Sequence, residues 1–309
     1  LAEGDALAEF VRERLGDEPD PFELVPRAAS RFDPARDLER VRLVSRPPSG
    51  RGRTFKDLWV KSSWLSDFDG EDSLRVRVSF GREQVDDASA DFARHLRVHE
   101  LAARLFPESA LLHGHPALAE LLERCTGTRV LFTQHIAYWN APGGGALFHH
   151  DAFGADDETE HGPGQLGVCY AQLSGRTAWL ALSTSDLALR VREFGTALRT
   201  ERELAWLHAQ LFPRPQDAAA FAKLLGDDRA LCDEIALPGC GRLGALVQRG
   251  PEFTAYLADA GHAALLEPGD VILLPNHGLT HTAMHSVFCA SDEPAYSLSL
   301  AVRSDEEPA

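Results

Sequence analysis

The stretch GGGALFHHDAFG, residues 143–154, places two adjacent histidines and an aspartate directly behind three glycines. Alternate residues of a β-strand point to the same face. A strand here would therefore project His149 and Asp151 together, and His150 away from them. An imidazole and a carboxylate on the inner face of a barrel can share one metal ion, so the stretch predicts a strand that carries metal ligands.

The pattern His149-x-Asp151 is weakly specific on its own. The chain has 13 histidines and 47 acidic residues, so about one such pair is expected by chance. A capped turn or a surface pair is the simpler explanation of the pattern alone. A histidine from another strand would complete a 2-His-1-carboxylate triad, which leaves positions open for substrate and O₂ at Fe(II). The elements around the stretch therefore decide between a metal site and a solvated turn.

Strand patterns lie on both sides of this stretch, and helical patterning over residues 184–265 separates them. Strands on the two sides must pair across that helical insert. The simplest architecture is therefore a mainly β fold with helices, a double-stranded β-helix or jelly roll. An α/β sheet would need a regular alternation of strands and helices, which is absent. The segments that favour strands are RVLFTQHIAYWN (129–140), ALFHHDAF (146–153), the hairpin QLGVCYAQLSGRTAWLALS (165–183), LEPGDVILLP (266–275) and AYSLSLAVR (295–303).

The residues before this region mix helices with one clear strand. The segment SLRVRVSFG (73–81) alternates strictly, which predicts a half-buried strand with its arginines on the polar face. Residues 5–16, 86–106 and 115–127 have helical periodicity. We therefore expect an N-terminal α/β region at residues 1–128 that packs on a jelly-roll core at residues 129–309.

The composition is ordinary but strongly acidic. The 309 residues are 44% hydrophobic and 25% charged, and the net charge is −16. So negative a surface repels phosphate backbones, and no nucleic-acid partner is expected. No run of about 18 apolar residues occurs, so no contact with a membrane is expected.

The cysteine pattern favours a reducing compartment. There are five cysteines and no C-x-x-C, so neither a disulfide framework nor a zinc ribbon is expected. The first segment, LAEGDALAEFVRERLGDE, is amphipathic and acidic, which is not typical of a signal peptide. A cytoplasmic location follows as the expectation, whereas the sequence does not predict the oligomeric state.

The order of motifs after residue 129 resembles that of the JmjC/cupin-like family of Fe(II), 2-oxoglutarate-dependent oxygenases. In that family a His-x-Asp/Glu pair is followed by a hairpin of the type Gln-φ-x-Gly-x-Lys-x-Trp. A Gly-Asp strand that ends in proline then leads to the distal histidine and a last alternating strand. The resemblance covers about residues 129–303, and the counterparts here are His149 and Asp151, Gln172, Gly175 and Trp179, Gly269 and Asp270, Pro275, and residues 296–302.

The resemblance implies that His149, Asp151 and a distal histidine hold Fe(II). The segment LPNHGLTHTAMHSV offers three candidates, His277, His281 and His285. The family's usual spacing after the proline favours His281. The family's His-x-Val pattern and the run into the last strand favour His285, which we expect to be the ligand. Histidines spaced by four would instead share a helix face, as in zinc sites, but a glycine interrupts the segment and H-E-x-x-H is missing.

The position of the family's lysine, which anchors the far carboxylate of 2-oxoglutarate, is Thr177 in this sequence. A threonine hydroxyl can hydrogen-bond a carboxylate but carries no charge. We therefore expect another cation to substitute, and Arg303 is the candidate, although a salt-bridged strand end explains Arg303 as well. Tyr138 and Asn140 share one face of the strand before the glycines. They are expected to hydrogen-bond the cosubstrate or substrate, unless they are satisfied polar groups of the core.

The resemblance implies an enzyme that uses Fe(II), 2-oxoglutarate and O₂ to hydroxylate a small-molecule or peptide substrate. Two other classes remain open. One is a metal-dependent cupin enzyme that does not use 2-oxoglutarate, which Thr177 favours. The other is a non-catalytic barrel that binds a ligand. Metal analysis separates the last class from the first two, and formation of succinate separates those two from each other.

Overall fold

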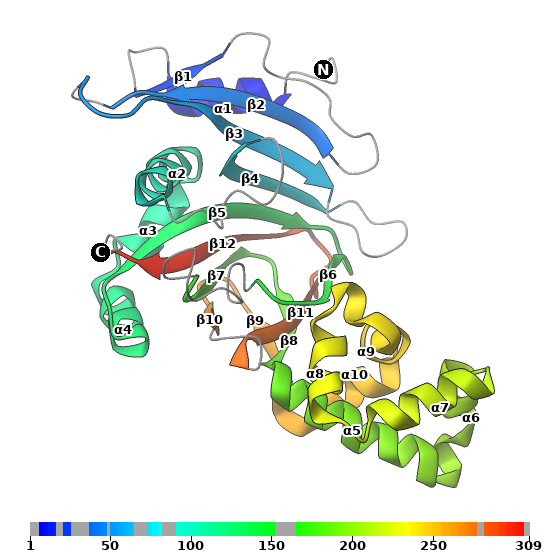
Figure 1. Ribbon diagram of the computed structural model, residues 1–309. Helices are drawn as coiled ribbons and strands as arrows, with labels where there is room; N and C mark the ends of the chain where they lie inside the picture. The colour runs from blue at the N-terminus through cyan, green and yellow to red at the C-terminus, as the bar shows by residue number, and fades with distance from the viewer. Residues whose placement is uncertain are drawn as a thin grey trace.

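Strands dominate the centre of the molecule and helices lie around them (Figure 1). The computed structural model describes residues 6–16, 21–25, 37–47, 50–64, 73–81, 91–151, 165–276 and 281–305. The strands are β1 Phe22–Leu24, β2 Asp37–Ser45, β3 Phe55–Trp64, β4 Leu74–Phe80, β5 Val130–Asn140, β6 Gly145–His149, β7 Gly167–Ser174, β8 Thr177–Ser183, β9 Ala263–Leu266, β10 Val271–Pro275, β11 Ala283–Cys289 and β12 Ala295–Ser304.

These strands form two antiparallel sheets. The larger has eight strands in the order β1-β2-β3-β4-β5-β12-β7-β10, and the smaller has four in the order β6-β11-β8-β9. Side chains from both sheets meet in one apolar cluster, which includes Tyr170 of β7, Trp179 of β8 and Val287 of β11. The β5-β12-β7-β10 half of the larger sheet and the smaller sheet therefore share a common apolar interior.

The N-terminal strands extend the same sheet, because β4 pairs with β5 through Arg75 opposite Tyr138 and Arg77 opposite Ile136. Helices α1 (Ala6–Leu15) and α2 (Phe92–Leu105) cover the face of the larger sheet that points away from the smaller sheet. Leu101 of α2 and Leu300 of β12 belong to the main apolar core between them. Helix α2 begins after Asp91, whose Oδ1 accepts a hydrogen bond from the Arg94 N–H at 3.3 Å.

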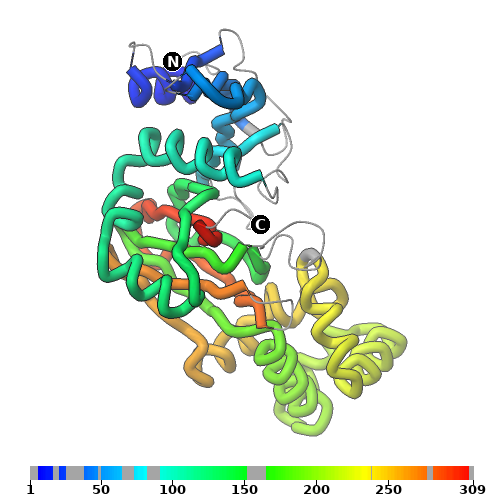
Figure 2. Tube along the Cα trace, turned by 60° about the vertical axis from the view of Figure 1, so that its left-hand side comes forward, coloured from blue at the N-terminus to red at the C-terminus, as the bar shows by residue number. Residues whose placement is uncertain are grey.

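A group of helices is inserted between β8 and β9 and has a core of its own. Leu187, Leu231 and Phe253 are buried in this core, and Leu182 and Met284 join it to the smaller sheet. Figures 1 and 2 both place the insert at the end of the molecule opposite the N-terminal strands. The elements are α5 Thr184–Thr200, η3 Arg202–Leu204, α6 Ala205–Leu211, α7 Pro215–Leu224, α8 Asp228–Ala236, η4 Pro238–Leu243, α9 Gly244–Val247, α10 Pro251–Leu257 and η5 Ala258–His262.

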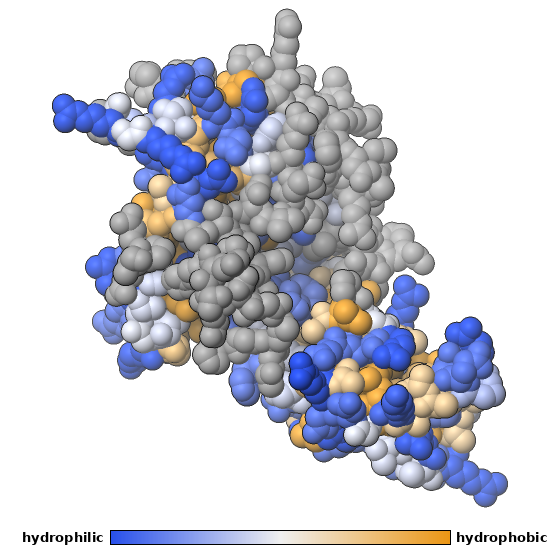
Figure 3. Space-filling view, viewed as in Figure 1, coloured by the Kyte–Doolittle hydropathy of each residue, from blue (hydrophilic) through white to orange (hydrophobic). Residues whose placement is uncertain are grey.

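Three further helical elements link α2 to strand β5, and they are η2 Pro107–Ser109, α3 Ala110–His113 and α4 Pro116–Thr126. Helix α4 ends at Gly127, whose φ of 73° is the left-handed conformation that glycine adopts at low cost. No helix in the described segments combines the length and the apolar character that a membrane crossing requires. On the face in Figure 3, hydrophilic and apolar residues are interspersed over the insert.

Candidate metal centre

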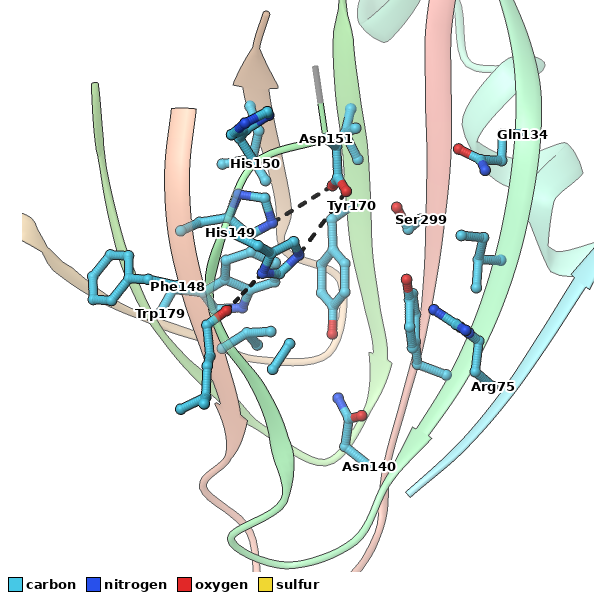
Figure 4. Close-up of a pocket in the computed structure, with 18 of the residues that line it drawn as sticks. Arg75, Gln134, Asn140, Phe148, His149, His150, Asp151, Tyr170, Trp179 and Ser299 are labelled. Carbon is cyan, nitrogen blue, oxygen red and sulfur yellow. Dashed lines mark hydrogen bonds and ion pairs between the residues drawn. The ribbon is translucent and has the colours of Figure 1, made fainter. Parts of the chain in front are cut away.

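Three side chains, from the last residue of β6, the segment just after it and β11, converge on one point. The Nε2 atom of His149 lies 3.9 Å from Oδ1 of Asp151, and the Nε2 atom of His285 lies 3.5 Å from Oδ2 of Asp151. One ligand atom of each residue lies within 4.8 Å of those of the other two. Figure 4 shows the imidazole of His149 beside the carboxylate of Asp151. The structure thus brings together the three residues that the sequence nominated as ligands.

The strand register creates this arrangement. Strand β11 pairs with β6 so that His285 lies opposite His149, and the two imidazole rings are 4.2 Å apart between centroids. Strand β6 ends at His149, so Asp151 lies just beyond it. The side-chain amide of Asn276 donates to the backbone carbonyl of Asp151 at 3.2 Å, which holds the carboxylate near the two histidines.

The backbone around the glycines explains how β6 approaches β11 so closely. A Cβ atom on Gly145 would lie 2.0 Å from the carbonyl oxygen of Val287, so only glycine fits there. Gly143 has a φ of +77°, which glycine tolerates without strain. The glycine-rich turn therefore allows β6, which carries His149, to pair closely with the edge of β11.

Hydrogen bonds to the backbone orient both imidazoles. The Nδ1 atom of His149 lies 2.7 Å from the carbonyl oxygen of Leu147, and that of His285 lies 3.1 Å from the carbonyl oxygen of Ala283. A carbonyl oxygen only accepts, so each Nδ1 must carry the proton. Each Nε2 then presents its lone pair towards Asp151, which is the tautomer that a metal ligand requires.

The two histidines differ in exposure. His285 is 3% exposed, and its ring stacks on Trp179 at 5.6 Å between centroids. Burial lowers the pKa of His285 to about 4, with a further contribution from His149, whereas Asp151 opposes the shift. His285 is therefore neutral at physiological pH, which leaves its Nε2 free to bind a cation.

The triad opens into a pocket of about 410 Å³ between the two sheets. Aromatic and aliphatic side chains form much of the wall, among them Phe148, Tyr170 and Trp179. Polar groups also line it, and Figure 4 shows Arg75, Gln134 and Ser299 on the wall opposite the triad. A cavity that combines apolar walls with converging polar groups and a metal-binding constellation is typical of an active site.

Tyr138 and Asn140, which we expected to face a ligand, both line this pocket. Asn140 is 2% exposed, and its Oδ1 atom has no hydrogen-bond partner among the residues that the structure describes. Burial raises the pKa of Tyr138 to about 12, so its hydroxyl stays protonated and can donate a hydrogen bond. These two residues therefore offer polar groups to an occupant of the pocket.

Thr177 and Arg303 do not line the pocket. The hydroxyl of Thr177 donates to Oε1 of Gln172 at 2.7 Å, and it accepts the indole N–H of Trp179 at 2.9 Å. Thr177 thus orients the tryptophan that stacks on His285. Arg303 is buried near the far end of β12, opposite Leu131 on β5. The placement gives no support to a role for Thr177 or Arg303 in anchoring a cosubstrate.

The remaining histidines near the motif have different positions. His281 is exposed and is not part of the triad, and His277 lies outside the described residues. Because His285 belongs to strand β11, a helical zinc motif through it is wrong. His150 lines the pocket together with the triad, contrary to its expected outward direction, because strand alternation stops at His149.

Among the pocket residues that the sequence pattern did not reveal are Arg75 and Arg77 of β4. The pattern placed them on the polar face of a half-buried strand, but Arg77 is only 8% exposed. The face is covered because β4 pairs with β5 in the larger sheet and turns its arginines towards the cavity. The strict alternation of residues 73–81 indicated that the two arginines share one face of the strand. It could not indicate that this face would line a pocket.

The donor set fits a divalent cation. Two neutral imidazole nitrogens and one carboxylate leave several coordination positions free, and this combination suits Fe(II) in oxygen-activating sites. The pocket also fits a cosubstrate that bears a carboxylate, since Arg75, Arg77 and Tyr138 line it. The residues present are therefore chemically suited to both groups.

No protein-family model matches the chain, and none of the curated proteins matches it. The solved structures that match include the ribosomal oxygenase YcfD of Escherichia coli, which is 13% identical with a TM-score of 0.28, over 92% of this chain and 48% of that one. A second YcfD structure is 15% identical, with a TM-score of 0.29 and coverages of 93% and 50%. A third, in complex with cobalt and succinic acid, is 14% identical, with a TM-score of 0.28 and coverages of 92% and 48%. The chain spans about half the length of these proteins, and TM-scores of this size carry no argument about its activity.

Proposed function

We propose that the chain is a non-haem Fe(II), 2-oxoglutarate-dependent oxygenase that hydroxylates a small-molecule or peptide substrate. One observation carries the proposal. His149, Asp151 and His285 offer ligand atoms within 4.8 Å of one another at the wall of a cavity. Two histidines and one carboxylate bind Fe(II) on one face and leave positions for a cosubstrate and O₂.

The strand order supports a double-stranded β-helix for residues 130–304. In this proposal β5-β12-β7-β10 and β6-β11-β8-β9 are its two four-stranded sheets. Two facing antiparallel sheets of eight strands in all are the jelly-roll architecture. The metal ligands then lie on β6, directly after it and on β11, at one mouth of the barrel.

With 2-oxoglutarate bound, Fe(II) would supply the activation of O₂ for hydroxylation of a C–H bond. The chain's own residues supply binding and orientation. The carboxylate of Asp151 offsets part of the charge of the dication, and the two backbone-bonded imidazoles hold their Nε2 atoms in place. Trp179 covers the buried side of His285 and keeps water from that ligand. Tyr138 and Asn140 offer a hydroxyl donor and an unpaired amide oxygen to the occupant.

A metal-dependent cupin enzyme without 2-oxoglutarate is the second candidate. The observation that favours it is the engagement of Thr177, whose hydroxyl already bonds Gln172 and Trp179. The residue at the family's lysine position then takes no part in binding an anion. In this case the triad would bind a metal ion, and the pocket would take the substrate alone.

One anaerobic titration separates the candidates. The protein is loaded with Fe(II), its metal content is measured, and 2-oxoglutarate is added while the visible spectrum is followed. The proposed oxygenase binds about one iron per chain and develops the charge-transfer band of a bidentate 2-oxo acid. Iron without a band at millimolar 2-oxoglutarate would favour the second candidate. A folded protein that retains no metal would favour a ligand-binding barrel.

A further inference from the structure

Arg75 is a half-buried cation at the wall of the pocket, on the side opposite the metal triad (Figure 4). Its Nε atom donates to the hydroxyl of Ser63 at 3.2 Å. Its side chain also hydrogen-bonds the hydroxyl of Tyr138. Both partners are neutral, and Arg75 forms no ion pair with a carboxylate within the described part of the chain. The guanidinium is thus oriented by its neighbours, but its charge is not offset by them.

The position of Tyr138 links Arg75 to the triad. The Tyr138 hydroxyl interacts with the guanidinium of Arg75 and also with the charge of Asp151. A ligand that fills the space beside Tyr138 therefore has the triad at one end and Arg75 at the other. This arrangement suits a molecule with two separated polar groups.

The charge around Arg75 favours an anion. Arg77 lines the same pocket, two residues further along β4. Two arginines converge on this cavity although the chain as a whole has a net charge of −16. Partial burial of a cation is costly unless an anion or hydrogen-bond acceptors compensate it. A planar guanidinium binds a carboxylate through two parallel hydrogen bonds, which is stronger than a neutral contact.

We propose that Arg75 is the carboxylate anchor of this pocket and that the pocket takes a carboxylate-bearing ligand which also reaches the metal ion. The inference rests on the proposed metal centre. The carboxylate belongs either to the far end of the 2-oxo acid cosubstrate or to an acidic substrate. In both cases Arg75 supplies the positive charge, and Ser63 and Tyr138 position it.

Isothermal titration calorimetry on the Mn(II)-loaded full chain tests this inference without turnover. In the first arm the ligands are 2-oxoglutarate and 2-oxopentanoate, which has a methyl group in place of the distal carboxylate. In the second arm the ligand is glutarate, added with and without saturating 2-oxoglutarate. The variants are Arg75→Gln, Arg75→Lys and Arg42→Gln, of which the last removes an exposed arginine from β2 of the same sheet.

If the cosubstrate carboxylate is anchored, the wild-type protein prefers 2-oxoglutarate over 2-oxopentanoate by about 10- to 100-fold. Arg75→Gln loses this preference while its affinity for 2-oxopentanoate is unchanged. If a substrate carboxylate is anchored, Arg75→Gln keeps the preference but loses the binding of glutarate to the metal-loaded protein. Arg42→Gln behaves as wild type in both cases.

The inference is overturned if Arg75→Gln matches the wild-type protein in both arms, or if the folded, metal-loaded protein binds none of these ligands. Failure of the proposed oxygenase has a different signature. The wild-type protein would then bind neither 2-oxo acid, while an Arg75-dependent affinity for glutarate remains. Should Arg75→Gln not fold, Arg75→Lys decides, because it keeps the charge but loses the bidentate geometry and should weaken the anchored ligand several-fold.

Discussion

The Nε2 atom of His285 lies 3.5 Å from Oδ2 of Asp151, although 134 positions separate the two residues along the chain (285 − 151). The relationship depends on the pairing of β11 with β6, which sets His285 opposite His149. Every element of the proposed chemistry starts from this convergence of two imidazoles and one carboxylate.

Asp151→Asn should abolish tight binding of a divalent metal. The substitution keeps the shape of the side chain but removes the charge that offsets the dication. We expect about one Mn(II) or Fe(II) per wild-type chain after equilibration with a weak chelator, and close to none in the variant. His281→Ala, at an exposed position outside the triad, is the control and should retain the metal. Full occupancy in Asp151→Asn would show that the triad does not hold the metal.

Asn276→Ala should lower metal affinity by about tenfold while the protein stays folded. The Asn276 amide donates to the backbone carbonyl of Asp151 at 3.2 Å, and its Oδ1 accepts from the hydroxyl of Thr282 at 3.2 Å. Loss of this amide frees the segment that carries the carboxylate ligand. Competition with a fluorescent chelator measures the affinity. Thr282→Val removes only the hydrogen bond that supports Asn276, so it should lower metal affinity less than Asn276→Ala. An equal loss of affinity in the two variants would contradict the direct role assigned to Asn276.

Gln248→Leu should lower the free energy of unfolding by about 1–3 kcal/mol. Strand β6 lies at the edge of its sheet, and the Gln248 side chain of the insert pairs with the backbone of Phe148. Its Oε1 accepts the Phe148 N–H at 2.6 Å, and its Nε2 donates to the Phe148 carbonyl at 2.8 Å. Urea titration checks the change. Gln248→Glu keeps an acceptor but loses the donor, so its loss should be intermediate, and no loss in either variant would contradict this role.

The stability of the protein should fall as the pH decreases from about 6.5 towards 3. Burial lowers the pKa of His135 to about 3, and the neighbouring His99 adds to the shift. The unfolded chain therefore binds a proton that the folded protein rejects. The full contribution of His135 to the free energy of unfolding is present above its pKa in the unfolded chain, which is about 6.5. As the pH falls below this value, the free energy of unfolding decreases by up to about 1.4 kcal/mol per pH unit.

His135→Leu isolates this contribution. His135 is fully buried and interacts with the backbone of Phe132, so an apolar side chain of similar size should change the stability at pH 7.5 by only about 1 kcal/mol. Urea unfolding between pH 7.5 and 4.5 should show a shallower loss of stability in the variant than in the wild-type protein. His115→Ala removes an exposed histidine and should keep the wild-type slope. Parallel curves for His135→Leu and wild type would refute the assignment.

Much of the local structure could be predicted because it depends on short periodicities. Alternation over residues 74–80 predicts strand β4, and the helical periodicity before Gly127 predicts α4. His149 and Asp151 could be grouped because they are two residues apart. The alternation does not continue past this pair, because the strand ends at His149 and His150 also reaches the pocket.

The identity of the third triad member required more than local pattern. His281 and His285 are both compatible with the sequence spacing, and the register of β11 against β6 is what places His285 beside His149. The anchors expected from motif positions were not the residues that face the cavity. Thr177 is engaged with Gln172 and Trp179, and the cations at the pocket come from β4 instead.

The sequence by itself determined which faces of β4 and β6 carry polar side chains, since that depends only on the two-residue period of a strand. Only the tertiary structure decided what those faces meet. Arg75 reaches the pocket because β4 pairs with β5, which places Arg75 opposite Tyr138, 63 positions along the chain (138 − 75). The backbone groups at the edge of a strand are the same in every strand, so they do not select a partner. Which strands pair therefore depends on the packing of the whole sheet. Side-chain alternation along one strand therefore cannot identify its neighbour.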